Sequence, residues 1–230
     1  MRKSCVGYNY NQKSVIVNFV SRFVKSHKLR SFLDIGAGFS ETTSRFNRIA
    51  DVYVAVEKNK SRAKKLEANG VNTICSEFPL KLNRSFDFIL CSHSIPEEQA
   101  KYDAFIDGAW KLLSENGYLM IITFKGRNDD WSKIRAKLKN ETAQAFEGND
   151  LKILKIKLAS LGKVVTKRIV SVEQSGNPMD IAKIQCDSFN EKPKRCLRFV
   201  SDELKDRYER DGVFYFPHRH TVLIVEKHTR

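Results

Sequence analysis

Three residues early in the chain have the types and spacing of a small-molecule binding turn. A short apolar run over 31–38 contains Asp34 and ends in Gly36 and Gly38. Glycines allow a tight turn and let the backbone approach a ligand closely. A helical pattern over 41–50 follows, and the free N–H groups at the start of a helix point toward whatever binds there. This order of strand, glycine turn and helix predicts a nucleotide-like molecule at the end of the first sheet strand.

A second acid narrows the kind of molecule that this turn can hold. Glu57 ends the next apolar run and follows Gly36 by 21 residues. A dinucleotide site with the pattern G-x-G-x-x-G would have its third glycine at position 41, where this chain has Glu41. A carboxylate there would crowd and repel a diphosphate. The pattern Asp-x-Gly-x-Gly with a distant acid is better suited to a cofactor without phosphate.

The rest of the chain alternates short apolar runs with amphipathic helices, which predicts βαβ units and a parallel sheet. The last two apolar runs are separated by a polar stretch and are expected to form an antiparallel edge. The predicted strands are 31–35, 51–57, 71–75, 86–91, 118–124, 163–172 and 213–225, and the predicted helices are 14–27 (with Ser14 as N-cap), 41–50, 58–69, 96–113 (opened by Pro96), 129–140, 150–161, 179–189 and 197–210.

Composition limits the class of protein and its surroundings. A chain of 230 residues with 41% apolar residues suits one domain with a substantial core. The net charge of +14 suggests an anionic partner, although we favour a lysine-rich, solvated surface. An odd number of cysteines without a C-x-x-C pair argues for free thiols in a reducing compartment and against structural zinc. No signal peptide or membrane span is evident, so we expect a cytoplasmic protein.

These residues resemble the class I S-adenosylmethionine-dependent methyltransferases over residues 30 to 125. The segment Leu33–Ser40 is similar to the first motif of that family, with Ser40 in place of its third glycine. The resemblance implies a Rossmann-like, seven-stranded, mostly parallel sheet with helices on both faces and an antiparallel last strand. It implies S-adenosylmethionine as cofactor, with Glu57 on the ribose hydroxyls and segment 76–79 on the adenine. The cofactor-binding residues implied are Asp34, Gly36, Ala37, Gly38, Glu57, Lys58, Glu77, Phe78, Cys91 and Ser92.

Methyl transfer by in-line displacement mainly requires alignment and exclusion of water. A base is needed only if the nucleophile carries a proton, and His93 and His218 are the candidates. Alternation along the last strand places His218 and His220 on one face, which we expect to be solvent-exposed, and Arg219 on the other. The candidate residues for binding the methyl acceptor are Tyr8, Tyr10, Trp131 and His220.

The layout suggests a single methyltransferase domain over 1–230. Residues 1–29 would form an N-terminal flap and helix, and 173–212 a small helical cap inserted between the last two strands, as in small-molecule N-methyltransferases. The alternative is a tRNA or rRNA methyltransferase using the basic surface, and a third hypothesis is a scaffold that has lost turnover. The identity of the methyl acceptor and the oligomeric state stay open. The basic residues of the inserted segment are Lys192, Lys194, Arg195 and Arg198.

Overall fold

The computed structural model describes most of the chain. The described residues are 7–38, 40–96, 98–124, 149–187, 192, 194, 197–198 and 208–228. The chain divides into two compact units: unit 1 comprises Met1–Val15, Gly126–Gly148 and Val170–Arg219, and unit 2 comprises Ile16–Lys125, Asn149–Ile169 and His220–Arg230. Two long strands, β7 (Val164–Ser175) and β9 (Val213–Glu226), have residues in both units.

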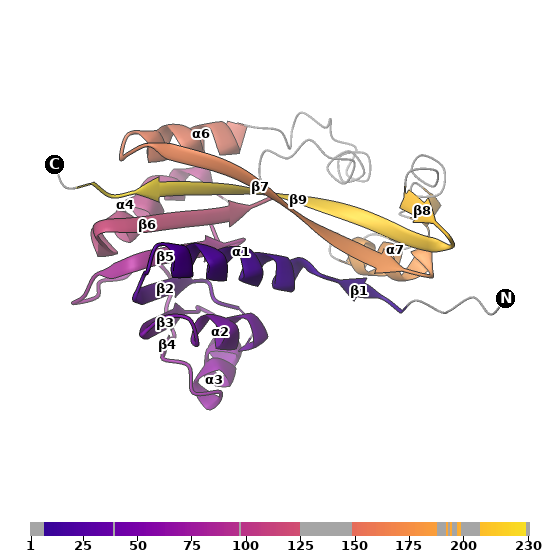
Figure 1. Ribbon diagram of the computed structural model, residues 1–230, viewed down its shortest axis with the longest axis horizontal. Helices are drawn as coiled ribbons and strands as arrows, with labels where there is room; N and C mark the ends of the chain where they lie inside the picture. The colour runs from indigo at the N-terminus through magenta and orange to yellow at the C-terminus, as the bar shows by residue number, and fades with distance from the viewer. Residues whose placement is uncertain are drawn as a thin grey trace. The chain divides into compact units, whose positions relative to one another are not determined.

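Unit 2 contains a mostly parallel sheet (Figure 1). The strands run in the hydrogen-bonded order β4-β3-β2-β5-β6-β9-β7, and β9 pairs antiparallel to β6. The strand order reverses between β2 and β5, which are parallel neighbours, and ligands of such sheets bind outside the carboxyl ends of the strands at this point. The predicted parallel sheet with an antiparallel last strand is confirmed. The remaining bounds are β2 (Ser31–Ile35), β3 (Val52–Val56), β4 (Thr73–Ile74), β5 (Phe86–Ser92) and β6 (Leu113–Thr123).

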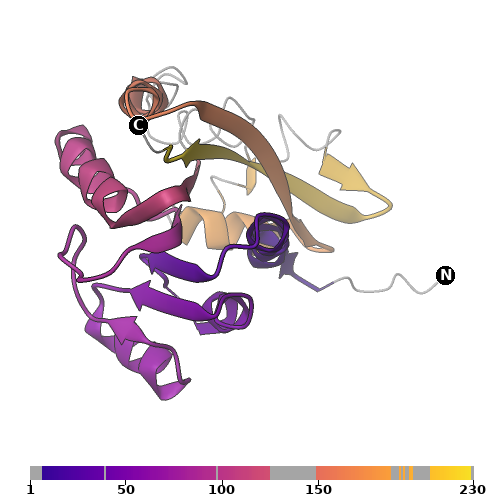
Figure 2. The same ribbon diagram turned by 60° about the vertical axis from the view of Figure 1, so that its left-hand side comes forward.

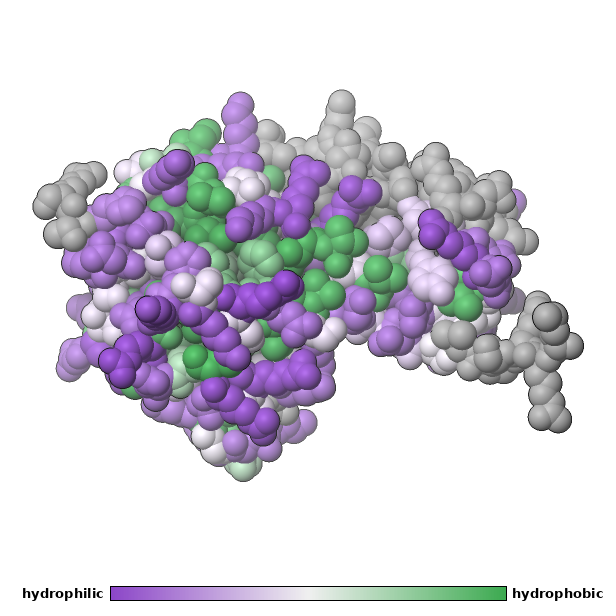
Figure 3. All heavy atoms as spheres, in the orientation of Figure 1, coloured by the Kyte–Doolittle hydropathy of each residue, from purple (hydrophilic) through white to green (hydrophobic). Residues whose placement is uncertain are grey.

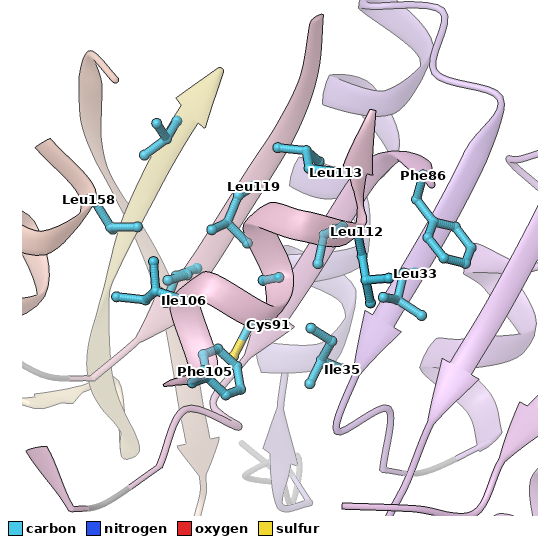
Figure 4. Close-up of a cluster of buried hydrophobic side chains, with 14 of the residues drawn as sticks. Leu33, Ile35, Phe86, Cys91, Phe105, Ile106, Leu112, Leu113, Leu119 and Leu158 are labelled. Carbon is cyan, nitrogen blue, oxygen red and sulfur yellow. The ribbon is translucent and has the colours of Figure 1, made fainter. Parts of the chain in front are cut away.

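Helices cover both faces of this sheet because its strands bury side chains on both sides. On one face, α4 (Tyr102–Leu112) and α6 (Asn149–Ala159) pack on side chains such as Leu33 and Cys91 (Figure 4). On the other face, Phe32 and its neighbours pack against α1 (Gln12–Ser26), α2 (Ser40–Phe46) and α3 (Lys60–Ala68). Figure 2 shows α1 and α4 on opposite sides of the strands. Each large apolar side chain buried in this way contributes about 1.5–3 kcal/mol.

Several element bounds differ from those predicted. Helix α1 begins before Ser14, whose hydroxyl donates to the Asn11 carbonyl instead of capping the helix. The helix predicted from Pro96 begins at Tyr102, after a 3-10 turn over Gln99–Lys101. Helix α2 ends at Phe46, and β6 already begins at Leu113. The helix predicted over 129–140 lies outside the described residues.

Unit 1 contains two short strands that the sequence analysis did not predict. β1 (Asn9–Tyr10) pairs antiparallel with β7, and β8 (Glu209–Arg210) pairs antiparallel with β9. Strand β7 continues to Ser175, so the segment between β7 and β9 begins later than residue 173. Helix α7 (Pro178–Asp187) corresponds to the helix predicted over 179–189. Most of 188–207 lies outside the described residues.

The cysteines are not all free thiols. Cys75 and Cys91 are free, whereas Cys186 is disulfide-bonded. The expectation of reduced cysteines was therefore wrong for Cys186. Within the described ranges, no helix combines the length and the apolar character that a membrane span requires, and no group of three or more potential metal-ligating side chains occurs.

Candidate functional site

The glycine turn after β2 is tied to the end of β3 by backbone hydrogen bonds. The N–H groups of Gly36 and Ala37 donate to the Val56 carbonyl at 2.8 and 3.2 Å. Gly36 and Gly38 have φ of +71° and +68°, in the left-handed region that favours glycine. A Cβ on Gly36 would lie 2.3 Å from the Cβ of Ser94, so packing as well as conformation requires glycine there.

Glu57 connects the glycine turn to the helix after β3. One of its carboxylate oxygens accepts a hydrogen bond from the Gly38 N–H at 3.0 Å, and the other accepts from the Asn59 N–H at 2.8 Å. The side chain of Asn59 in turn caps α3. Glu57 is buried. These two bonds use about half of the lone-pair positions of a carboxylate, which leaves the others for hydroxyl donors.

Asp34 is a second buried carboxyl group beside the turn. The Tyr53 hydroxyl donates to it at 2.7 Å. Burial raises the pKa of Asp34 to about 7, the Tyr53 hydrogen bond opposes this rise, and the charge of Glu57 adds to it. Within the described part of the chain, no Lys or Arg forms an ion pair with Asp34 or Glu57. The site is therefore rich in hydrogen-bond acceptors, which suits hydroxyl groups and positive charge and disfavours phosphate.

The structure shows how the predicted adenine-binding segment is held. Phe78 is half-buried, and its ring packs edge-on against Phe105 of α4 with centroids 5.1 Å apart. A Cβ on Gly108 of α4 would lie 2.6 Å from the Cβ of Pro79, so glycine permits this close approach. Glu77 is exposed, as is Lys58. Contact of these residues with a cofactor stays a prediction.

The end of β5 meets the glycine turn through Ser94. The Ser94 hydroxyl donates to the carbonyl of Ile35 and lies 3.2 Å from the sulfur of Cys91. Cys91 is fully buried in the hydrophobic core, and burial raises the pKa of its thiol to about 12, so the group is neutral. Ser92 is half-buried at the strand end. The side chain of Cys91 thus packs in the core, and its predicted cofactor contact stays a prediction.

His220 and His218 do not lie on an exposed face of β9. Their exposed fractions are 0% and 2%, and Phe216 is buried on the same face. The expectation of a solvent-exposed face was wrong, whereas Arg219, on the opposite face, is exposed. In unit 2, Nδ1 of His220 lies 3.1 Å from Nε2 of His93, so the structure brings together two of the predicted site residues.

A second polar cluster lies within unit 1. The Tyr8 hydroxyl donates to one oxygen of Glu173 at 2.7 Å, and Nε2 of His218 donates to the other at 2.9 Å. The ring of Tyr10 lies 4.8 Å from that of His218. Burial and the Glu173 carboxylate raise the pKa of Tyr8. Trp131 lies outside the described residues.

Sequence reasoning missed Glu173, which is fully buried. The available signal was the alternation along β7, where Ser171, Glu173 and Ser175 are all buried. Because this inner face is polar, hydropathy alone does not distinguish it from the outer face, where Val170 is exposed.

The comparisons with known proteins concern the fold. No family model and no curated protein match the sequence. Among the solved structures that resemble it is the YcgJ protein from Bacillus subtilis, with 14% identity and a TM-score of 0.60 over 93% of this chain and 99% of YcgJ. The N-methyltransferase NodS from Bradyrhizobium japonicum WM9 has 10% identity and a TM-score of 0.55 over 95% and 96% of the two chains.

A third similar structure is the plantazolicin methyltransferase BpumL, solved with a pentazolic desmethylPZN analog and S-adenosylhomocysteine (SAH). It has 13% identity and a TM-score of 0.55, and the alignment covers 94% of this chain and 86% of BpumL. NodS has also been solved with SAH. At these identities the likeness shows the fold alone. The chain has the Rossmann-like fold of S-adenosylmethionine-dependent methyltransferases.

Proposed function

We propose that this protein is a methyltransferase that binds S-adenosylmethionine (SAM). The observation that carries the proposal is the acceptor-rich glycine turn at the reversal of strand order. SAM has no phosphate, carries positive charge and presents ribose hydroxyls, so it fits a site formed by two carboxyl groups. When bound, the cofactor supplies an electrophilic methyl group. Glu57 would accept hydrogen bonds from the ribose hydroxyls, and the turn at Gly36 and Gly38 would lie against the cofactor.

We propose a small molecule as the methyl acceptor. NodS and BpumL support this, because one is named an N-methyltransferase and the other was solved with a pentazolic desmethylPZN analog. Tyr8, Tyr10, Trp131 and His220 remain predicted contacts of that molecule, and His93 and His218 remain the candidate bases. The single-domain organisation, the N-terminal flap over 1–29 and the cap over 173–212 also remain predictions, as does the cytoplasmic location.

No observation favours the alternative of an RNA substrate. Neither NodS nor BpumL is named as acting on RNA. Lys192, Lys194 and Arg198 are exposed, and Arg195 lies outside the described residues. On the face shown in Figure 3, hydrophilic residues are spread over α2 and α3 with small hydrophobic areas between them. Strongly salt-dependent binding of tRNA or rRNA would revive this alternative.

Binding of SAM and SAH to the Glu57→Gln variant tests the proposal. The wild-type chain should bind both molecules, measured by calorimetry, and should not bind NAD. Glutamine has one acceptor oxygen instead of two, so it cannot accept from Gly38 and Asn59 and also from a ribose. We expect affinity to fall at least about tenfold, since a hydrogen bond to a charged group contributes about 1.5–3 kcal/mol.

Asp51→Asn is the matched control for this experiment. Asp51 precedes β3 at the strand end opposite Glu57, and its exposed carboxylate pairs with Arg30. This variant should bind SAM and SAH like the wild type. Urea unfolding of Glu57→Gln without ligand separates lost binding from lost folding. Absence of SAM and SAH binding by the wild type, or undiminished binding by a folded Glu57→Gln, would contradict the proposal.

A further inference from the structure

Two histidines in unit 2 form a hydrogen-bonded pair. His93 directly follows β5, and His220 lies in β9, with Nε2 of His93 and Nδ1 of His220 3.1 Å apart. His220 is fully buried and His93 is half-buried. One of the two facing nitrogens must carry a hydrogen and donate it, while the other accepts. The two rings therefore share one proton position between them.

This geometry restricts the charge of the pair. If both rings were imidazolium ions, two N–H groups would point at each other across 3.1 Å, so the pair accepts one extra proton and resists a second. The ring of Phe124 stacks on His93 at 4.1 Å and lies 4.6 Å from His220. It holds both rings in place, and its π face favours a positive charge on either ring.

His93 is held beside the glycine turn. Its φ of +56° is left-handed, which is uncommon for a residue other than glycine, and its N–H donates to the Ile122 carbonyl at 2.8 Å. The next residue, Ser94, donates to the Ile35 carbonyl and fills the space beside Gly36. A backbone held in a sparsely populated conformation at a strand end often belongs to a functional site.

Several other ionisable groups lie near the pair within the described chain. His218, two residues before His220 on the same face of β9, is hydrogen-bonded to Glu173. Cys91 on β5 is a neutral thiol, and Arg219 points to the opposite, exposed face of β9. Asp34 on β2 pairs in register with Leu90 of β5, three residues before His93. Asp34 binds the Tyr53 hydroxyl and remains a separate titrating group, which the experiments below must control for.

We propose that the His93–His220 pair accepts the proton that the methyl acceptor loses during transfer. The methyl acceptor then belongs to the class whose nucleophile bears a proton, an amine nitrogen or a hydroxyl oxygen. This inference rests on the proposed methyltransferase function. The nucleophile's lone pair forms the bond to the methyl carbon, the carbon–sulfur bond breaks with its electrons left on sulfur, and the N–H or O–H proton moves to a ring nitrogen of His93.

His220 can take over the proton that His93 has accepted. When His93 takes up a proton, the proton between the rings can shift from Nε2 of His93 to Nδ1 of His220. The positive charge then resides on His220, and His93 is again neutral. His220 thus acts as a positioning and relay residue, because it is reached only through His93 in this scheme.

Proton release on cofactor binding tests the pair without a methyl acceptor. The sulfonium of SAM should disfavour a proton on a nearby histidine pair, whereas the neutral sulfur of SAH should not. Calorimetry in two buffers of different ionisation enthalpy, from pH 5.5 to 8, measures the protons released. We expect SAM to release more protons than SAH, and we expect His93→Gln and His220→Gln to make this difference smaller than in the wild type.

Different results of this experiment would contradict the role of the histidine pair and the proposed methyltransferase function. His228→Gln, which removes an exposed histidine, is the matched control and should keep the difference. Asp34 is present in all variants, so its contribution cancels when the SAM–SAH difference of a variant is subtracted from that of the wild type. If SAM and SAH release equal numbers of protons on binding, or if both histidine variants keep the full wild-type difference, the pair has no such role. If neither molecule binds the wild type, the proposed function fails instead.

Turnover of a panel of small molecules, followed as SAH formation, tests the class of methyl acceptor. Amines and phenols should be methylated, and His93→Gln should lower kcat by about 10²–10⁴-fold with little change in KM. Methylation confined to thioethers or tertiary amines, or an unchanged kcat in His93→Gln, would overturn the proposal. Should the variants not fold, nitrogen NMR of the wild type with SAH decides: two titration steps more than about one pH unit apart support the pair, and independent titration refutes it.

Discussion

At the scale of single residues, the charge of Asp34 depends on its buried surroundings. Its exposed fraction is 4%, and its hydrogen-bond donor is the neutral hydroxyl of Tyr53. A buried carboxylate without a cation is costly, so the group keeps its proton to a higher pH than in water. The nearby charge of Glu57 acts in the same direction. Asp34 therefore changes charge near neutral pH, beside the proposed cofactor.

We predict that Asp34 makes stability depend on pH. The folded protein keeps the Asp34 proton up to about pH 7, whereas the unfolded chain loses it near the ordinary pKa of 3.8. Between these values the folded state binds more protons, so the stabilisation is fully present below about pH 4 and is lost as pH rises through 7. A shift of about three pKa units corresponds to roughly 4 kcal/mol.

Asp34→Asn isolates this contribution because asparagine does not titrate. We expect the free energy of unfolding of the wild type, relative to the variant, to fall between pH 4 and 8. Urea unfolding at a series of pH values measures the difference, in which other titrating groups such as Asp87 cancel. A difference that stays constant with pH would show that Asp34 is ionised throughout.

At the scale of elements, the glycine turn and the end of β5 fit together through one side chain. Ser94 occupies the space where Gly36 lacks a side chain. We predict that Gly36→Ala destabilises the protein by about 2–5 kcal/mol. The left-handed backbone contributes about 1–2 kcal/mol of this, and overpacking against Ser94 contributes about 1–3 kcal/mol. Thermal or urea unfolding measures the loss.

A double-mutant cycle separates the two causes. In a Ser94→Gly background the clash is gone, so Gly36→Ala should cost only the backbone term. Ser94→Ala keeps the Cβ and loses only the hydroxyl, so it should not rescue Gly36→Ala. If Gly36→Ala lowers the free energy of unfolding equally in the wild type and in Ser94→Gly, close packing against Ser94 does not contribute to the requirement for glycine at position 36.

At the scale of the whole molecule, each unit has its own tyrosine–carboxylate hydrogen bond. Tyr8 hydrogen-bonds Glu173 in unit 1, and Tyr118 is hydrogen-bonded to Glu226 in unit 2. We predict that Tyr8→Phe removes one hydrogen bond from the buried Glu173 carboxylate and weakens unit 1 by about 1–3 kcal/mol. Amide hydrogen exchange of Asn11 and Val172, which bond each other, should then be about tenfold faster or more.

Tyr118→Phe is the matched control, since it removes the same hydroxyl from a carboxylate in the other unit. It should leave the exchange of Asn11 and Val172 unchanged. If exchange at Asn11 and Val172 accelerates equally in both variants, the regions around Tyr8 and Tyr118 open together in one cooperative step.

The sequence by itself determined the features that depend on local pattern. The glycine turn, the acid after the second sheet strand and the alternation of strands and helices predicted the mostly parallel sheet, because conformational preference and hydrophobic period act over short stretches. Asp34, Gly36 and Glu57 were predicted as cofactor contacts from such local patterns. The argument against a diphosphate, that Glu41 stands where a dinucleotide site has its third glycine, also needed no structure.

Only the tertiary structure decided which polar residues are buried and which meet. Glu173, His218 and His220 are polar residues that the structure buries, whereas we had expected the histidine side chains to be exposed. The His93–His220 bond joins residues 127 positions apart. Such a contact depends on strand order and register, which hydrogen bonding between distant segments establishes. For the same reason, the fit between Gly36 and Ser94 was not visible in the sequence.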